Sequence, residues 1–340
     1  MKKLLEVKNL STSFYTHLGE VQAVRDISFS LNEGDVLGIV GESGSGKSVT
    51  ALSIMRLIGI PGEIKAGKIT FEELDLLDLK KKEMEHLRGN EIAMIFQDPM
   101  TSLNPVFRIQ NQMVEVIRKH TDLSYKEAVE RAIDLLKQVG IPDPVSQIHD
   151  YPHQFSGGMR QRALIATAIS CKPKLLIADE PTTALDVTIQ AQILELLRKL
   201  QKETGMSIVL ITHDLGVIAE ICSHVIVMYG GKIMEKGTVR DVFYRPQHPY
   251  TQGLHKSIPK TANEKSRLIP IEGSPPDLLK PPMGCPFSPR CPHAMEVCLT
   301  DEAPEFILTD THSSACWLHD KKGPSTDSFL KGEEVLLDER

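Results

Sequence analysis

The sequence lacks any long hydrophobic run. Its longest apolar runs, such as residues 175–178 and 207–211, have only the length of a strand, so no membrane-spanning helix is expected. The N-terminal residues carry charges where a signal peptide would need an apolar core. We therefore expect a cytosolic protein that reaches the cytoplasmic face of a membrane only by docking on a partner.

An excess of positive charge is lacking as well. The 340 residues include 39 Lys and Arg against 45 Asp and Glu, a formal net charge of −6. Because nucleic-acid-binding domains are normally basic, this balance argues against a nucleic-acid partner. Internal repeats and heptad tracts are also missing. The remaining composition, 41% hydrophobic and 25% charged, is typical of a globular protein, and the length favours two units.

The order of the apolar patterns indicates an α/β chain. A continuous apolar run at 36–40 is typical of a strand buried on both faces of a parallel sheet. The predicted strands are 36–40, 174–178, 207–212 and 224–228, and the predicted helices are 49–59, 126–139, 157–170 and 188–203. From about Pro246 onward prolines cluster and periodicity disappears, which indicates a domain boundary.

A phosphate-binding loop follows the first buried strand. The run Gly41-Glu42-Ser43-Gly44-Ser45-Gly46-Lys47-Ser48 fits the pattern G-x-x-x-x-G-K-[ST] and precedes a predicted helix. Glycines allow the backbone to wrap a polyphosphate, while a helix N-terminus favours negative charge. Lys47 can reach the terminal phosphates and Ser48 can bind Mg²⁺. The sequence therefore predicts a nucleoside triphosphate site.

Two carboxylates end a second buried strand. Asp179 and Glu180 follow the apolar run 175–178, and ligands bind at the carboxyl ends of parallel strands. We expect Asp179 to hold Mg²⁺ through water and Glu180 to act as the general base for the attacking water.

A third motif identifies a family. Ser156-Gly157-Gly158 lies 23 residues before Asp179, where its hydroxyl and close backbone N–H groups can meet a phosphate. With this motif the chain resembles the ABC ATPases over about residues 4–256. The outer signature positions depart from the family, because Phe155 and Met159 replace the usual Leu and Gln.

The resemblance implies further site residues. Gln97 matches the glutamine that contacts Mg²⁺ and the attacking water, and His213 matches the histidine that contacts the γ-phosphate. Asp186 resembles the D-loop aspartate, and Val49 ends the nucleotide-binding loop. Phe14 lies where the family places the aromatic ring that stacks on adenine, although the adjacent Tyr15 is an alternative.

The same resemblance implies the architecture. It is an α/β fold: a P-loop ABC-type nucleotide-binding domain at 1–245 with a β-rich N-terminal part and a helical subdomain at about 98–156. A small, irregular, Cys-rich C-terminal extension spans 246–320, and a polar tail spans 321–340. In this family two such domains pack head to tail, so that Ser156, Gly157, Gly158 and Asp186 serve the ATP of the partner.

Further runs indicate one group of ABC transporters. Residues 97–105, 155–162 and 247–251 are similar to the ATPases of oligopeptide, dipeptide and nickel uptake, and the form of residues 41–49 is similar to the D-type subunit. The implied partners are a homologous F-type ATPase subunit (or a second copy), two transmembrane permease subunits and, indirectly, an extracytoplasmic substrate-binding protein. Peptides are the expected cargo. Nickel or another small solute, or a soluble ABC ATPase without a transport role, are the alternatives.

Four of the six cysteines lie close together in the proline-rich region, at positions 285, 291, 298 and 316. A segment with so little apolar sequence gains folding energy from a metal. The thiols of Cys285, Cys291, Cys298 and Cys316 suit a [4Fe–4S] cluster or zinc, and free thiols are the third reading. His293 and His312 are possible zinc ligands. Similarity to peptide-transporter ATPases favours the [4Fe–4S] cluster.

Overall fold

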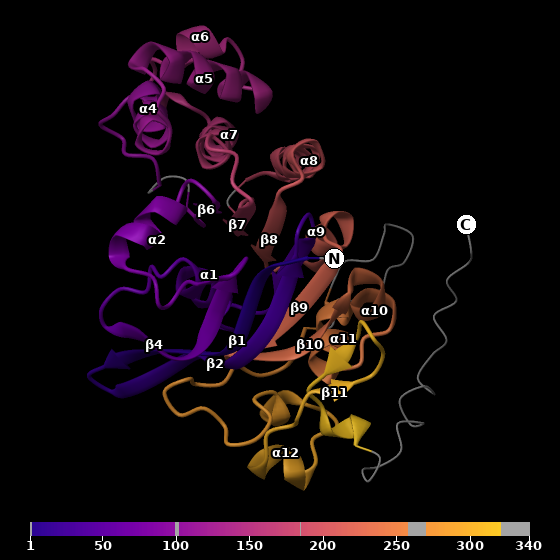
Figure 1. Ribbon diagram of the computed structural model, residues 1–340. Coiled ribbons are helices and arrows are strands. Elements are labelled where there is room, and N and C mark those ends of the chain that lie inside the picture. Colours follow the sequence, from indigo (N-terminus) through magenta and orange to yellow (C-terminus); the bar gives the residue numbers. More distant parts are fainter. Residues whose placement is uncertain (1, 99–101, 184, 258–269, 321–340) are drawn as a thin grey trace, which may run out of the picture.

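The computed structural model describes residues 2–98, 102–183, 185–257 and 270–320, and the predicted tail at 321–340 lies outside them. Within these residues no helix is long and apolar enough to cross a membrane. Two sheets organise the chain (Figure 1). The smaller has the strand order β2-β1-β4-β5, and the larger has the order β11-β12-β10-β9-β3-β8-β7-β6.

The smaller sheet is antiparallel and comes from the N-terminal part of the chain. It contains β1 (Lys3–Thr16), β2 (Gly19–Asn32), β4 (Gly62–Phe71) and β5 (Leu74–Asp75). Leu5, Leu10 and Ile69 from this sheet are fully buried in a core that also includes Leu37 and Ile39 of the larger sheet. The β-rich N-terminal part expected from the sequence is therefore present.

The larger sheet is parallel at its centre. The parallel strands are β3 (Val36–Val40), β6 (Ile92–Ile95), β7 (Leu175–Asp179), β8 (Ser207–Thr212) and β9 (His224–Tyr229). Side chains alternate between the faces of a strand, so Leu37 and Ile39 enter one core while Val36 and Val40 enter the other. The strands predicted near 36–40, 174–178, 207–212 and 224–228 are confirmed.

Helices cover both cores. They are α1 (Lys47–Ile54), α2 (Lys81–Leu87), α7 (Gly157–Ala168), α8 (Val187–Thr204), α9 (Leu215–Ile221) and α10 (Val239–Tyr244). The predicted helix at 49–59 was wrong at both ends. It starts at Lys47, directly after the loop glycine, and it stops before Arg56, whose positive φ of 49° leaves the helical region.

A separate helical group lies at one end of the molecule, at the top of Figure 1. It contains α4 (Ile109–His120), α5 (Tyr125–Gln138) and α6 (Pro144–Gln147), followed by the 3-10 turn η1 (Pro152–Gln154). Ser124 and Glu127 form a capping box at the start of α5. The amphipathic helix predicted at 126–139 is confirmed, because Ala128, Ala132 and Leu135 are buried.

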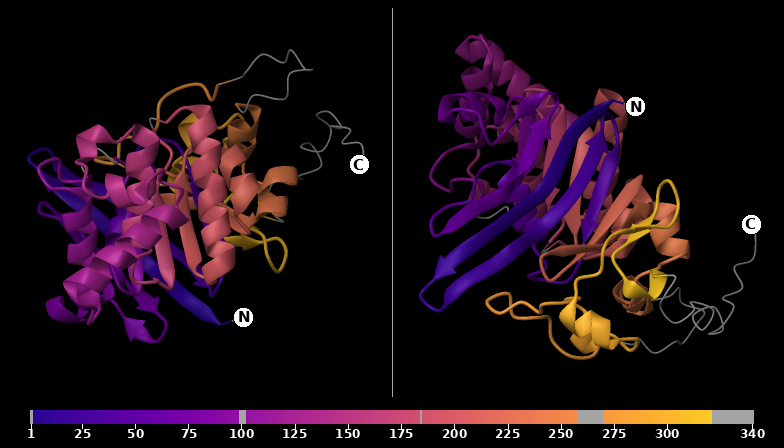
Figure 2. Two further views of the ribbon diagram at one scale, coloured as in Figure 1. Left: turned by 90° about the horizontal axis from the view of Figure 1, so that it is seen from above. Right: turned by 60° about the horizontal axis from the view of Figure 1, so that its bottom comes forward.

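The C-terminal region has more regular structure than its sequence suggested. It contains α11 (Pro249–Lys256), η2 (Ser288–Arg290), α12 (Glu296–Thr300), β11 (Phe306–Ile307), β12 (Ser313–Ser314) and η3 (Trp317–His319). Strand β12 pairs antiparallel with β10 (Lys232–Thr238) and thereby extends the larger sheet. Figure 2 shows this region at the end of the molecule opposite α4 and α5.

Candidate nucleotide-binding site

The loop at 41–48 joins β3 to α1 and curls tightly on itself. Gly46 has φ of +100°, and a Cβ there would come within 2.5 Å of the Ala23 carbonyl oxygen. Gly41 is equally confined, since a Cβ would come within 2.1 Å of the Met228 carbonyl oxygen. Gly44 also has a positive φ, of +77°. A side chain at Gly41 or Gly46 would collide with backbone oxygens, and the positive φ values at all three positions favour glycine.

Lys47 lies across the loop. Its Nζ donates hydrogen bonds to the carbonyl oxygens of Gly41 (2.8 Å) and Glu42 (2.9 Å), and the residue is 5% exposed. Burial lowers the pKa of Lys47, while the carboxylates of Glu180, Asp179 and Glu42 act in the opposite direction. The ammonium group is thus held among the backbone groups of a loop suited to phosphate.

The remaining residues of this loop differ in exposure. Ser43 and Gly44 are exposed at its tip, Ser45 is buried, and Val49 is half-buried against the core of the smaller sheet. The exposed tip leaves backbone N–H groups open to a ligand.

The end of β7 meets the start of α1. Ser48 Oγ donates a hydrogen bond to Asp179 Oδ1 at 3.0 Å. Burial raises the pKa of Asp179, and the nearby Glu180 charge adds to that effect, while the Ser48 hydroxyl opposes it. A hydroxyl beside a carboxylate is a suitable pair of oxygen ligands for Mg²⁺.

Glu180 is the centre of a second group of side chains. Its carboxylate accepts hydrogen bonds from Gln97 Nε2 (3.0 Å) and Thr183 Oγ1 (2.8 Å), and His213 Nδ1 lies 3.5 Å away. Burial alone would raise the pKa of Glu180, but the Thr183 hydroxyl and the His213 imidazole outweigh it, so this pKa lies below the ordinary value. The structure thus brings Gln97, Glu180 and His213 together from three separate segments.

The glycine-rich motif at 156–158 starts α7. Ser156 caps the helix by accepting a hydrogen bond from the Met159 N–H (3.3 Å), and Asp186 caps α8 by accepting one from the Ile189 N–H (2.9 Å). A Cβ at Gly158 would come within 2.8 Å of Ile189, so the two helix starts lie close together.

The two departures at this motif have a packing explanation. Phe155 is 2% exposed and lies in the core that also contains Val36 and Val40, and Met159 packs against the same core. Both side chains fill core volume, and Ser156 is left at the exposed helix start.

The predicted adenine-stacking residue lies near the turn after α1. The ring of Phe14 covers Gly62, where a Cβ would come within 2.6 Å of its Cε1 atom. Tyr15, the alternative, is 45% exposed. Both aromatic rings stay candidates for stacking on adenine.

Two residues to which the sequence-based predictions gave no role in the site contact the nucleotide loop, and a third, Tyr229, accepts a hydrogen bond from one of them. Tyr250, which is fully buried, accepts a hydrogen bond from the Glu42 N–H at 2.9 Å. Arg290 donates to Glu42 Oε2 (2.7 Å) and to Tyr229 Oη (3.0 Å). The motif at 247–251 was a signal that could have pointed to Tyr250, whereas Arg290 had no such signal.

The four clustered cysteines line one cavity. Cys285, Cys291, Cys298 and Cys316 line it together with His248 and His293, and the space between them is small, about 10 Å³. Burial raises the pKa of Cys285 to about 11 and that of Cys316 to about 12, so these groups are neutral thiols at pH 7 without a metal. In the described ranges, no three His, Cys, Asp or Glu side chains are arranged to hold a single metal ion.

Two histidines near these cysteines differ in position. His248 is buried and its Nδ1 accepts from the Tyr250 N–H, while its Nε2 has no hydrogen-bond partner among the described residues. His312 lies outside the cavity, where its Nε2 is 2.7 Å from Glu235 Oε1. Of the two histidines proposed as zinc ligands, His293 alone therefore lines the cavity.

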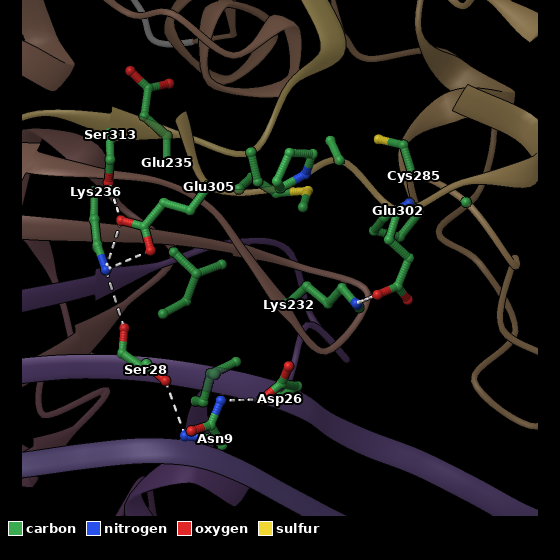
Figure 3. A pocket seen from close by; sticks show the side chains of 18 residues that line it. Asn9, Asp26, Ser28, Lys232, Glu235, Lys236, Cys285, Glu302, Glu305 and Ser313 are labelled. Carbon is green, nitrogen blue, oxygen red and sulfur yellow. Dashed lines mark hydrogen bonds and ion pairs between the residues drawn. The ribbon is translucent and has the colours of Figure 1, made fainter. Parts of the chain in front are cut away.

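A polar cavity of about 380 Å³ separates the smaller sheet from the C-terminal region (Figure 3). Lys232 pairs with Glu302 across it, and Lys236 pairs with Glu305 at 2.9 Å. Lys236 also donates to the Ser28 carbonyl oxygen. Because these charges are paired with one another, the cavity is not a candidate ligand site. It lies at the boundary between the smaller sheet and the C-terminal region, which we call the extension seam.

Comparison with protein families gives two matches. Residues 24–183 match the ABC transporter family, and residues 234–298 match the C-terminal region of oligopeptide/dipeptide transporters. The second match contains Tyr250, Arg290 and three of the clustered cysteines.

Curated relatives match almost the whole chain. The dipeptide transport ATP-binding protein DppD of Bacillus subtilis is 52% identical over 323 residues, which cover 95% of this chain and 96% of the relative. The oligopeptide transport ATP-binding protein OppD of the same species is 53% identical over 327 residues, covering 96% and 91%. OppD of Escherichia coli is 53% identical over 295 residues, covering 87% of each.

Solved structures support the fold. A dimeric, post-hydrolysis state of the ATP-binding cassette MJ0796 with ADP and phosphate has a TM-score of 0.63 at 27% identity, covering 69% of this chain and 99% of that one. CbiO1 of Clostridium perfringens, part of an ABC transporter complex, has a TM-score of 0.61 at 27% identity, covering 72% and 92%. The chain belongs to the family of ABC transporter ATP-binding subunits that includes the dipeptide and oligopeptide transport proteins DppD and OppD.

Proposed function

We propose that this chain is the ATP-hydrolysing subunit that energises an ABC importer of dipeptides or oligopeptides. The observation that carries the proposal is the 52–53% identity to peptide transport ATP-binding proteins over nearly the whole chain. The structure also places Ser48 beside Asp179, and Gln97 and His213 beside Glu180. Because these relatives are named for peptides, we favour peptides over nickel as the cargo, and transport over a soluble, non-transport role.

The proposed chemistry needs positioning and charge stabilisation rather than a covalent intermediate. Residues 41–49 wrap the triphosphate, Lys47 contacts the β- and γ-phosphates, and Phe14 stacks on adenine. Ser48, Gln97 and Asp179 hold Mg²⁺. Glu180 takes the proton of the attacking water as a carboxylate, and the direction of its pKa shift favours that ionised form. His213, beside Glu180, contacts the γ-phosphate.

The complete site needs a second ATPase subunit. Ser156, Gly157, Gly158 and Asp186 lie at two adjacent helix starts, and helix N-termini favour the negative charge of a phosphate. We place them on the ATP held by the partner. We propose a homologous F-type subunit as that partner, with a second copy of this chain as the alternative.

The other proposed partners are two membrane proteins and a binding protein on the far side of the membrane. Residues 98–156, within the ATPase domain at 1–245, form a helical subdomain that receives two transmembrane permease subunits at the cytoplasmic face of the membrane. An extracytoplasmic substrate-binding protein delivers the peptide. Residues 246–320 are the C-terminal extension, referred to below as the extension.

Reconstitution tests this function. The chain is purified with the ATPase and permease subunits encoded beside it and placed in proteoliposomes with the corresponding binding protein. We expect ATP hydrolysis to rise when the binding protein carries a peptide. Stimulation by Ni²⁺ and not by peptides, or by neither, would contradict the proposed cargo.

We further propose that Cys285, Cys291, Cys298 and Cys316 hold a [4Fe–4S] cluster. Two observations support the fit: four thiols line one cavity, and the buried His248 Nε2 beside them has no hydrogen-bond partner in the part of the chain that the structure describes. Bound as thiolates, the cysteines would link distant parts of the extension and supply folding energy. Anaerobic purification tests this. About four irons and four sulfides per chain, with absorbance near 400 nm, are expected. One zinc per chain, or no metal, would contradict it.

A further inference from the structure

The nucleotide loop contains a negative charge of its own. Glu42 is its second residue, and its carboxylate is one of those that act electrostatically on the phosphate-binding Lys47. A carboxylate in a loop that must bind a triphosphate repels the ligand unless a cation compensates it. The loop itself offers no second cation, since Lys47 is its only basic residue.

The compensating cation comes from the extension. Arg290 lies 248 positions further along the chain, its side chain is 6% exposed, and its Nη1 is 2.7 Å from Glu42 Oε2. Its Nε and Nη2 donate to the carbonyl oxygens of Glu272 (2.9 Å) and Ile271 (2.9 Å). The guanidinium is thus fixed by bonds on each of its nitrogens.

Neighbouring residues also hold the contact between Arg290 and Glu42 in place. Tyr229 on β9 accepts a hydrogen bond from Arg290 Nη1 at 3.0 Å, and its ring lies 5.7 Å from the guanidinium carbon. On the other side of the loop, the Glu42 N–H donates to Tyr250 Oη. Pro275 and Pro276 line the same hollow as Ser43. The loop is therefore held by the extension at the side chain and the backbone N–H of Glu42.

We propose that Arg290 is a positioning residue for ATP binding, which neutralises the Glu42 carboxylate and fixes the nucleotide loop from the extension. Arg290 does not touch the phosphates in this account. It acts through Glu42, so that the extension contributes to nucleotide affinity.

Equilibrium binding of Mg-ATP to the full chain, purified with its cysteine site intact, tests the proposal. Arg290→Met leaves the Glu42 charge uncompensated, and we expect binding to weaken about tenfold. Adding Glu42→Gln to that variant removes the charge as well, and we expect most of the affinity to return. Glu42→Gln alone is measured beside the double variant, so that the rescue is judged against a loop that already lacks the Glu42 charge.

This rescue separates charge compensation from a merely structural role. If Arg290 only held the extension in place, the double variant would bind ATP as weakly as Arg290→Met, and the proposal would be wrong. Unchanged affinity in Arg290→Met would also overturn it. Should Arg290→Met fail to fold, Arg290→Gln keeps a hydrogen-bond donor without the charge and is expected to show the same loss and the same rescue.

Glu302→Gln is the matched control. Glu302 belongs to the extension, pairs with Lys232 across the extension seam (Figure 3) and with Arg25, and makes no ion pair with the nucleotide loop among the described residues. We expect this variant to keep its Mg-ATP affinity. A tenfold loss here too would mean that any loosening of the extension weakens binding, which would contradict a specific role of Arg290.

Discussion

At the scale of single residues, the two adjacent carboxylates at the end of β7 have opposite electrostatic environments. Burial raises the pKa of Asp179, whereas hydrogen bonding from Thr183 and the proximity of His213 place the pKa of Glu180 below its usual value. Two neighbouring acids with different environments are suited to different tasks. In our proposal Asp179 helps to bind Mg²⁺ and Glu180 acts as the base.

The role of Glu180 leads to a first prediction. Glu180→Gln is expected to lower the hydrolysis rate in the assembled transporter by at least about 100-fold, because an amide cannot accept the proton of the attacking water. Mg-ATP binding is expected to persist. Phosphate release and equilibrium binding measure the two effects. Glu195→Gln, on an exposed part of α8, is the control, and substantial hydrolysis by Glu180→Gln would contradict the assignment.

The hydrogen bond from Thr183 leads to a second prediction. This hydroxyl lowers the pKa of Glu180, so Thr183→Ala should raise that pKa. The base would then become protonated at a higher pH, and the acid limb of the kcat profile should move to higher pH. Thr121→Ala removes a hydroxyl that donates to the Ile117 carbonyl and is the control. An acid limb that stays in place would show that Glu180 does not set it.

At the scale of elements, the starts of α7 and α8 combine capping with a proposed role in catalysis. Ser156→Ala is expected to cost about 1 kcal/mol of stability and also to impair ATP hydrolysis in the assembled pair, while Mg-ATP binding to this chain's own loop is retained. Ser124→Ala removes an equivalent cap from α5. It should show the stability loss alone, and equal hydrolysis by both variants would contradict a role of Ser156 on the partner's ATP.

The extension is fixed to the larger sheet through a buried carboxyl group. Glu235 on β10 is 1% exposed, lies 2.7 Å from His312 Nε2, and accepts the N–H groups of Gln247 and His248. Glu235→Ala leaves these buried groups without a partner, so we expect a loss of about 3 kcal/mol in the free energy of unfolding. Denaturant titration measures it. Glu305→Gln, at the exposed Lys236 pair, is expected to change stability by less than about 1 kcal/mol.

Sequence patterns could predict elements whose signal is local. The buried strands appear as continuous apolar runs, and the helix at 126–139 appears as a 3.6-residue period, so both were confirmed. The strand pairing of β12 with β10 could not be predicted, because two residues carry too little pattern and their partner is distant in the chain. The α1 boundary was missed because backbone conformation at Arg56, rather than hydrophobicity, ends that helix.

At the scale of the whole molecule, segments from all parts of the chain meet at one site. The phosphate loop and the acids on β7 carry recognisable motifs, and the sequence therefore predicted them. Arg290 has no motif, and its contact with Glu42 spans 248 positions, so only the folded chain reveals it. The cavity lined by the four cysteines could not be predicted either, because the spacing of cysteines along the chain does not say how their thiols are arranged in space.

Uptake by cells tests the proposed cargo and the proposed energy source together. Cells that lack this chain receive either the original gene or Glu180→Gln, and the entry of a labelled dipeptide, a labelled oligopeptide and Ni²⁺ is measured. We expect the original gene to restore uptake of at least one peptide class, Glu180→Gln to restore none, and Ni²⁺ entry to stay unchanged. Peptide uptake restored equally by Glu180→Gln, or restoration of Ni²⁺ entry alone, would contradict it.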